Sequence, residues 1–429
     1  MKQRIAITGM GLITSCGLGV EPYWEAVSRG LSYLGYFSDP SYQNSPVRIG
    51  GQIRDFNPIA FVKSRKSLKL MSREIQLAVA ASQLAVQDSG LDLSQVNRDR
   101  FGISIGTGII NSELDEVGLG IKNGLTDEGE FCFQKFGQSG IRSLYPLWLL
   151  KYLPNMPACH ISIAHGLRGP SNTITTSSAA GTQAIGEACR IIERGDADLM
   201  LCGGTDSKIN AMGLARFNSL GLLSFHNHIP QKAYCPFDRC HDGIILGEGA
   251  GLLVLEGWEH ARRRSARIYA EIVGYGSSSD FNYDPKHPED FTGKRQAMMG
   301  ALQDAAMAPN EIGFLLANGS GIPLEDIQES HAIQSVFQSA LSEIKVTGVK
   351  PITGHVVYGA GGVELAAGIM ALREGRVPPL ANLDVPDPEC DLPFAKKAES
   401  SEAKSFLFNS FGFGGQNAAL VVAQTDSRD

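Results

Sequence analysis

The sequence predicts a layered α/β protein. Short runs of apolar and β-branched residues alternate with alanine-rich segments of helical periodicity, which is typical of layered α/β architecture. Several apolar runs are continuous rather than alternating, as in strands buried on both faces. An apolar run at 268–274 opens like the one at the N-terminus and hints at a duplication. With 429 residues and 43% hydrophobic content, the chain can bury a large core, in one large domain or two fused ones.

The expected elements follow in chain order. The apolar run Ile5–Thr8 is broken by glycine and threonine too early for a signal peptide and is interpreted as the first strand. Glu74–Asp88 has helical periodicity, and Gly90 closes the helix. Further strands are expected at Phe101–Gly106, Leu199–Gly203, Leu252–Leu255 and Ile268–Gly274, with Arg262–Arg267 as a helix end before the last of them.

Residues 172–188 are the most informative stretch. They predict a small-residue strand, a turn that carries Ser178, and a helix. The first N–H groups and the positive end of the helix dipole gather at such a turn. Acyl-transfer enzymes place a nucleophile there because the N–H groups stabilise the oxyanion. Taken alone, the segment fits a packed strand and helix without chemistry more simply, since serine-rich turns are common.

Charge and hydropathy exclude several classes of function. The formal net charge of −7 argues against a nucleic-acid partner. No stretch approaches the ~18 uninterrupted apolar residues of a transmembrane helix, so we expect no membrane association and a cytoplasmic protein. Two glycine-rich stretches, 247–251 and 412–415, lack the spacing and context of a dinucleotide-binding fingerprint, and we expect no nucleotide cofactor.

The eight cysteines do not predict a metal site. They are scattered without a Cys-x-x-Cys pair, and the nearest approach to a cluster is Cys235 with Cys240 and His241. This group lacks a second pair of ligands, so buried free thiols in a reducing compartment are the better interpretation.

One local charge cluster stands out in this acidic chain. Residues Lys63–Arg73 place five positive charges in eleven residues. The cluster predicts either a solvated helix face or a dock for an acidic partner. The sequence alone favours neither interpretation.

Four ordered stretches, together with Ile-Thr-Gly-Met-Gly at 7–11, resemble one family. They are Gly169–Ser171, Cys235–Gly251, Lys350–Glu364 and Asn409–Asn417. The chain strongly resembles the β-ketoacyl-acyl carrier protein synthases, condensing enzymes of the thiolase superfamily, over nearly its whole length. The resemblance implies a thiolase-like fold: two similar α/β halves in a five-layered α-β-α-β-α arrangement. We place an N-terminal half at 1–257 and a C-terminal half at 258–429, with the active site between them.

The chain departs from the family pattern at its centre. Thr176-Ser177-Ser178 matches the family's Thr-Ala-Cys, so Ser178 replaces the nucleophilic cysteine. Asn318 stands where the first active-site histidine opens the family's His-Gly-Thr-Gly-Thr motif, and Ile322 replaces its last threonine. The retained residues are Lys350, His355 and Glu364.

These changes separate two chemical tasks. A serine hydroxyl needs an adjacent general base before it can accept an acyl chain, and the Ser178 segment supplies none, although His355 can approach in space. Decarboxylation of a malonyl thioester needs only donors aimed at the thioester oxygen, which Asn318 and His355 can provide. We therefore expect Ser178, Asn318, His355 and Lys350 to form the catalytic centre.

The pattern resembles the decarboxylating ketosynthases of polyketide β-branching cassettes, which carry serine in place of cysteine. They convert malonyl-acyl carrier protein to acetyl-acyl carrier protein. The alternative is a chain-length factor, the inactive partner of a ketosynthase in a heterodimer, although the retained Lys350, His355 and Glu364 weigh against it. An engineered Cys-to-Ser change is disfavoured because Asn318 is altered independently.

The resemblance also implies the surroundings of the site. We expect Ser320, Phe411 and Phe413 to bind substrate, whereas Ile322 predicts altered contacts to the pantetheine arm. The expected partner is an acyl carrier protein, whose phosphopantetheine arm carries the substrate, so the protein needs no cofactor or metal of its own. We expect a homodimer, or a heterodimer with a ketosynthase if the alternative holds.

Overall fold

Two sets of five strands build the centre of the molecule with the same order and directions. The computed structural model describes residues 3–62, 64–280 and 290–425. The first set runs from the edge strand β6 (Ser171–Ile174) through β5 (Phe101–Gly106), β7 (Leu199–Ser207) and β8 (Glu248–Gly257) to β1 (Ile5–Thr14). The second runs through β11 (Lys345–Thr347), β10 (Phe314–Leu316), β14 (Ser405–Phe411), β15 (Gln416–Ala423) and β9 (Ala270–Ser279). If the strands of each set are numbered by their order in the chain, they lie side by side in the order third, second, fourth, fifth, first. In each set the second strand pairs in parallel with both the third and the fourth.

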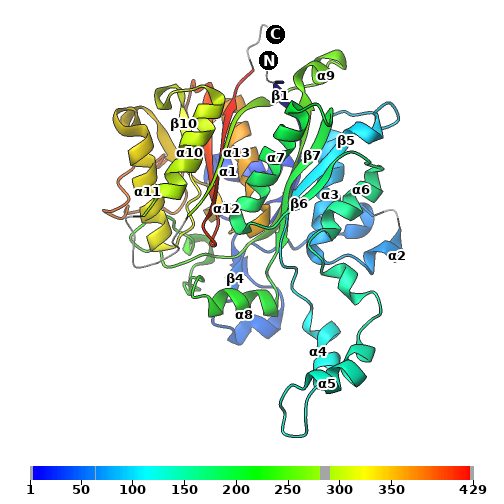
Figure 1. Cartoon of the computed structure of the whole chain (residues 1–429). Coiled ribbons are helices and arrows are strands. Elements are labelled where there is room, and N and C mark those ends of the chain that lie inside the picture. The colour runs from blue at the N-terminus through cyan, green and yellow to red at the C-terminus, as the bar shows by residue number, and fades with distance from the viewer. Residues whose placement is uncertain (1–2, 63, 281–289, 426–429) are drawn as a thin grey trace.

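Helices lie between the two sets of strands, which join where β1 pairs with β9, and further helices cover the sets outside. The helices α7 (Ala180–Glu193) and α13 (Ala360–Glu374) contact strands of both sets and form the middle layer. The helices α3 (Arg73–Asp88) and α6 (Met156–His165) cover the first set, and α10 (Thr292–Ala305) and α11 (Pro323–Phe337) cover the second (Figure 1). The predicted five-layered arrangement of two similar α/β halves is therefore confirmed. We retain the division into 1–257 and 258–429 as a proposal.

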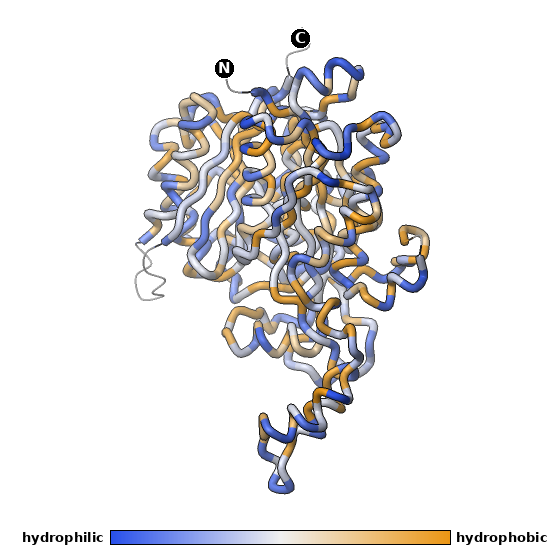
Figure 2. Tube along the Cα trace, turned by 45° about the vertical axis from the view of Figure 1, so that its right-hand side comes forward, coloured by the Kyte–Doolittle hydropathy of each residue, from blue (hydrophilic) through white to orange (hydrophobic). Residues whose placement is uncertain are grey.

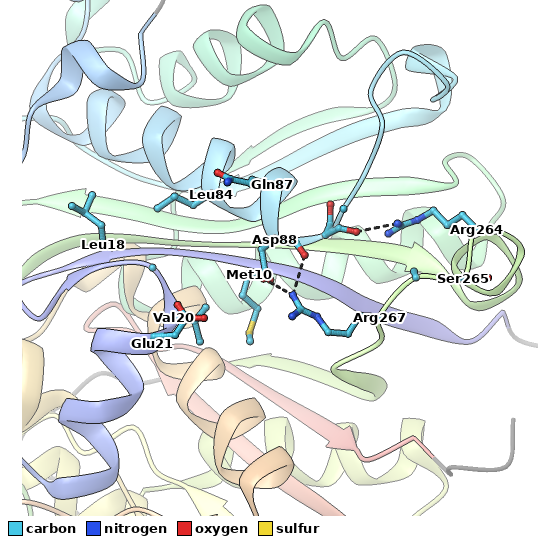
Figure 3. A pocket seen from close by; sticks show the side chains of 14 residues that line it. Met10, Leu18, Val20, Glu21, Leu84, Gln87, Asp88, Arg264, Ser265 and Arg267 are labelled. Carbon is cyan, nitrogen blue, oxygen red and sulfur yellow. Dashed lines mark hydrogen bonds and ion pairs between the residues drawn. The ribbon is translucent and has the colours of Figure 1, made fainter.

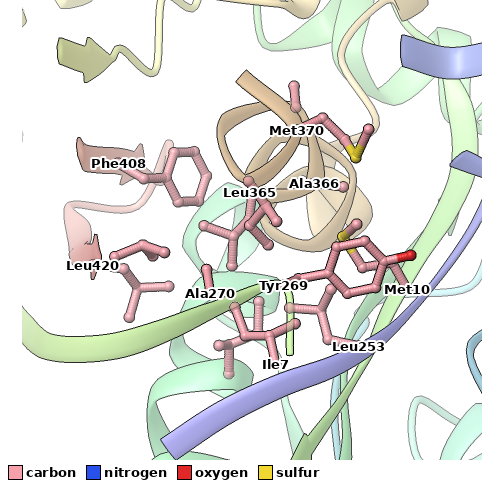
Figure 4. Packing of buried hydrophobic residues seen from close by; sticks show 14 of the residues in the cluster. Ile7, Met10, Leu253, Tyr269, Ala270, Leu365, Ala366, Met370, Phe408 and Leu420 are labelled. Carbon is pink, nitrogen blue, oxygen red and sulfur yellow. The ribbon is translucent and has the colours of Figure 1, made fainter. Parts of the chain in front are cut away.

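The core is continuous between the halves. Figure 4 shows Leu365 and Ala366 of α13 packed between Leu253 of the first set of strands and Phe408 and Leu420 of the second. Residues 360–372 of α13 are all buried, as expected for a helix that is enclosed on every side.

Smaller elements complete the fold. The helices α4 and α5 lie on an arm, rich in apolar residues, that projects from the end of the body opposite the termini (Figures 1 and 2). The elements are α1 (Val20–Arg29), α2 (Arg65–Leu68), α4 (Leu114–Lys122), α5 (Phe133–Lys135), α8 (Ala211–Ser219), α9 (Trp258–Arg263), α12 (Lys350–Thr353), β2 (Gly17–Leu18), β3 (Gly35–Tyr36), β4 (Ile49–Gly50), β12 (Arg376–Val377) and β13 (Glu399–Ser400). Among the described residues, none of the helices combines the length and the apolar character that crossing a membrane requires.

The predicted elements are present, but several are longer than expected. The strand β1 continues past Thr8 to Thr14, through glycines that were expected to end it. A Cβ atom at Gly11 would lie 2.0 Å from the carbonyl oxygen of Ala81, so this glycine lets α3 pack directly on the strand. The strand predicted at 199–203 extends to 207, and the one predicted at 252–255 spans 248–257. The strand predicted at 268–274 begins at 270 and extends to 279, and the helix before it ends at Arg263.

Candidate active site

Ser178 lies in the turn that joins β6 to α7, as predicted. The turn Ser177–Ala179 directly precedes the helix, and Ser177 adopts a left-handed backbone conformation with φ of 54°. Ser178 is fully buried. Its carbonyl oxygen accepts a hydrogen bond of 2.9 Å from the hydroxyl of Ser410, at the end of β14. The turn of the first half is therefore fastened to a strand of the second.

His355 reaches Ser178 from the second half. The Nε2 atom of His355 lies 3.2 Å from the Oγ atom of Ser178. The backbone N–H of Val357 donates to Nδ1 at 3.1 Å, so Nδ1 holds a lone pair and Nε2 carries the proton of the neutral ring. Burial and the nearby Lys350 charge lower the pKa of His355 well below its usual value. His355 is therefore a neutral donor toward Ser178 rather than a base that removes its proton.

The amide of Asn318 is oriented by two donors. Its Oδ1 atom accepts hydrogen bonds of 3.2 Å from the Nζ atom of Lys350 and from the backbone N–H of Phe411. Because both donors face the oxygen, the amide nitrogen is left to donate elsewhere. Lys350 also donates to the backbone carbonyl of Asn318 and, at 2.9 Å, to Glu364. Burial raises the pKa of Glu364, and the Lys350 ammonium opposes this shift.

Two buried carboxylates, which sequence reasoning missed, hold the loop that carries Asn318. Glu329 of α11 accepts from the backbone N–H groups of Asn318 and Gly319, both at 2.8 Å, and burial raises its pKa to about 7. Asp326 accepts from the backbone N–H of Gly321 at 3.1 Å. A sequence signal existed, because acidic residues spaced by three at the start of a helix share one face, here toward the preceding loop.

The predicted substrate-binding residues occupy different positions. Ser320 is buried, and its hydroxyl donates to Asp326 at 3.3 Å and accepts from the backbone N–H of Ile322 at 3.1 Å. The ring of Phe411 packs in the core of the second half, whereas the half-buried ring of Phe413 lies 5.4 Å from that of His355. Phe413 thus borders the site directly, whereas Ser320 supports the loop that follows Asn318.

The predicted basic cluster is only partly available to a partner. Lys66 and Lys69 are exposed, as is Arg65. Arg73 instead forms a 3.0 Å ion pair with Glu248 and donates to the backbone of Ile53. Lys63 lies outside the described residues.

A separate hollow of about 680 Å³ lies away from these residues, between α3, the start of α1 and the segment before β9 (Figure 3). Its lining includes the basic side chains of Arg264 and Arg267. Both are engaged, since Arg264 donates to the carbonyl of Ser89 at 2.9 Å and Arg267 donates to Asp88. The hollow contains none of the predicted catalytic residues.

The cysteine side chains do not form a cluster. All eight cysteines are free, and within the described ranges no group of three or more His, Cys, Asp or Glu side chains is placed to hold a metal ion. His241, the nearest candidate ligand, instead lies between the carboxylates of Asp326 and Asp387.

Comparison with known proteins identifies the family. Two α/β halves of equal topology with a site between them define the thiolase-like class. The family model for the β-ketoacyl synthase N-terminal domain matches residues 2–261, and that for the C-terminal domain matches residues 269–384. The chain belongs to the β-ketoacyl synthase family.

Its relatives are condensing synthases. The 3-oxoacyl-[acyl-carrier-protein] synthase 2 of Synechocystis sp. is 36% identical over 98% of each chain, and that of Vibrio cholerae is 36% identical over 98% of this chain and 99% of its own. A β-ketoacyl synthase from Burkholderia phymatum superposes with a TM-score of 0.87 at 29% identity, covering 99% of this chain and all of its own. The ishigamide ketosynthase/chain length factor gives a TM-score of 0.86 at 28% identity with the same coverage.

The turn at residue 178 should still activate a thiol. We expect Ser178→Cys to react with iodoacetamide faster than the native buried cysteines, because the start of α7 and the Nε2–H of His355 stabilise a thiolate. Burial instead raises the pKa of Cys16 and of Cys390 to about 12. Peptide mapping after timed labelling measures each rate. Labelling at 178 no faster than at Cys16 would contradict the electrostatic role of the turn.

Proposed function

We propose that the protein decarboxylates malonyl-acyl carrier protein to acetyl-acyl carrier protein in polyketide β-branching biosynthesis, without forming an acyl-enzyme. The observation that carries the proposal is the hydrogen bond from the backbone N–H of Val357 to Nδ1 of His355, which selects the tautomer. Because Val357 N–H occupies Nδ1, the ring presents an N–H to the site. The same arrangement that deprives Ser178 of a base therefore supplies a donor for an oxyanion.

The proposed reaction uses donors alone. As the bond between the carboxylate carbon and the α-carbon breaks, carbon dioxide leaves and the electron pair forms an enolate whose charge lies on the thioester oxygen. His355 Nε2–H and the Asn318 amide nitrogen would stabilise that oxygen. Protonation of the α-carbon by water then gives the acetyl thioester. Each donor is expected to contribute ~2.7–4 kcal/mol to the barrier reduction.

Acyl transfer to Ser178 is expected to be slow. A neutral histidine that donates toward the hydroxyl cannot accept its proton at the same nitrogen, and the lowered pKa of His355 makes it a weak base. The homologous condensing synthases are named for 3-oxoacyl products, so loss of condensation is a proposal specific to this chain.

The proposed partners follow from the substrate. A similar solved structure holds a type II PKS acyl-carrier protein in complex with its ketosynthase bound to the hexaketide, at 28% identity and a TM-score of 0.84. We propose that an acyl carrier protein docks here on the exposed charges of Arg65, Lys66 and Lys69, and brings its own pantetheine arm. We also propose a homodimer and no resident cofactor.

The second candidate function is that of a noncatalytic chain-length factor. Replacement of the nucleophile by Ser178 favours it, and one of the similar structures is a ketosynthase/chain length factor pair. The oriented Asn318 amide and the Lys350–Glu364 pair favour a working site instead, since a scaffold alone does not need them.

Incubation with malonyl-acyl carrier protein tests the proposal. We expect intact-mass spectrometry to show loss of carbon dioxide from the carrier protein and no added mass on the enzyme. The reason is that decarboxylation needs the two donors and not a nucleophile. Malonyl-carrier protein that stays unchanged at high enzyme concentration would favour the chain-length-factor function.

His355→Ala should reduce kcat more than Ser178→Ala does. Loss of an oxyanion donor costs about 10²–10³ in kcat, whereas a serine without a covalent role acts mainly by positioning. Steady-state rates of acetyl-carrier protein formation compare the two variants. Equal and near-complete loss in both would mean that Ser178 is a working nucleophile.

Charge reversal at Lys66 and Lys69 should raise the apparent KM for malonyl-acyl carrier protein with little change in kcat. Both side chains are exposed, and exposed charges act mainly on encounter. The effect should shrink at high salt, where such charges are screened. Lys396→Glu with Lys397→Glu is the matched control, because this exposed pair carries the same charge. An unchanged KM at low ionic strength would make the cluster a solvated helix face.

A further inference from the structure

The imidazole ring of His241 lies between two carboxylates. Its Nδ1 atom is 2.9 Å from Oδ2 of Asp326 on α11, and its Nε2 atom is 3.5 Å from Oδ2 of Asp387. Only 7% of the residue is exposed. The site thus holds a buried histidine with an acidic group on each side of its ring.

The contacts of both ring nitrogens with carboxylate oxygens point to a charged ring. Ionised carboxylate oxygens only accept, so each ring nitrogen that faces one must carry a proton. Both oxygens of Asp326 also accept from other donors, namely the backbone N–H groups of Phe237 and Gly321 and the Ser320 hydroxyl. Because donors already occupy both Asp326 oxygens, the shared proton is assigned to the His241 ring.

Electrostatics agree with this assignment. Burial alone would lower the pKa of His241, but the hydrogen bond and charge of Asp326, with those of Asp387, raise it above its usual value. Asp238 and Asp242 lie on its own loop, and the buried thiol of Cys390 lies near both carboxylates that flank the ring. The two carboxylates of Asp326 and Asp387 thus favour the charged form of His241.

Asp326 connects this cation to the active-site loop. One of its oxygens accepts from His241 and Phe237, and the other accepts from Ser320 and Gly321, two and three residues after Asn318. We propose that His241, as an imidazolium bridging Asp326 and Asp387, is a positioning residue that fixes the 318–322 loop and thereby the Asn318 donor. The expected effect of His241 on turnover rests on the proposed decarboxylation.

His241→Gln removes the charge and one of the two contacts. We expect amide hydrogen exchange at residues 318–322 to rise about tenfold because the loop opens locally more often. kcat should fall by about tenfold to a hundredfold with KM little changed, as expected for a misplaced catalytic group. His260→Gln is the matched control, because His260 pairs with Glu256 at 2.7 Å outside the active site. It should leave the 318–322 loop and turnover unchanged.

The stabilisation of the loop by charged His241 is expected to decrease at alkaline pH. Since the folded pKa is raised above the ordinary ~6.5, the stabilisation by His241 is complete below that value and is lost as pH rises through the raised pKa. In His241→Arg, a permanent cation should retain slow loop exchange and abolish this alkaline loss of kcat and stability.

NMR of [¹⁵N]histidine-labelled protein, assigned by the signals missing in His241→Gln, should show both nitrogens of His241 protonated at pH 7. Asp387→Asn should lower the pKa of His241. If His241→Gln does not fold, the same NMR and hydrogen-exchange measurements on Asp387→Asn test the proposal. A neutral His241 at pH 7, or His241→Gln with wild-type exchange at 318–322, would overturn the proposal. The NMR and hydrogen-exchange measurements do not depend on turnover. They therefore distinguish failure of the proposed role of His241 from failure of the proposed decarboxylase function.

Discussion

The buried ammonium of Lys350 sets the chemistry of the whole site. Its three donors are matched by three acceptors, namely the backbone and side-chain oxygens of Asn318 and the carboxylate of Glu364. A buried cation is costly unless it is paired in this way. Once paired, it orients the amide of Asn318 and adds to the burial that lowers the pKa of His355, so that one charge acts on both groups.

The site joins groups from both halves of the chain, which also share one continuous apolar core. Ser178 lies in the turn between β6 and α7 of the first half, and His355, Asn318 and Lys350 belong to the second. Their registry depends on short polar contacts, such as that of the Ser410 hydroxyl with the carbonyl of Ser178. Family membership leaves open which steps this site performs, because a shared fold hosts more than one chemistry. The protonation of individual nitrogens decides between acyl transfer and oxyanion binding.

Local patterns predicted the elements but not their contacts. The strand at 101–106 was predicted to the residue, because its apolar run is bounded on both sides. The length of β1 was underestimated, because a glycine that breaks a strand in isolation here admits a helix. The approach of His355 to Ser178 was anticipated only as a possibility, and its tautomer depends on a backbone N–H that no motif reveals. Arg73 counted toward a surface cluster, yet Glu248, 175 residues away, binds it. Such long-range pairs lie beyond sequence patterns.

The pairing of the first strand has a consequence for synthesis on the ribosome. Ile5 of β1 lies opposite Gly257 of β8 and Ile272 of β9. Although β2 and α3 are made early, the strands β8 and β9 that flank β1 are translated only after more than half of the polypeptide. At ~5–20 residues per second this interval lasts many seconds, during which an unpaired apolar strand is prone to aggregate. The nascent chain is thus a natural client for ribosome-associated chaperones.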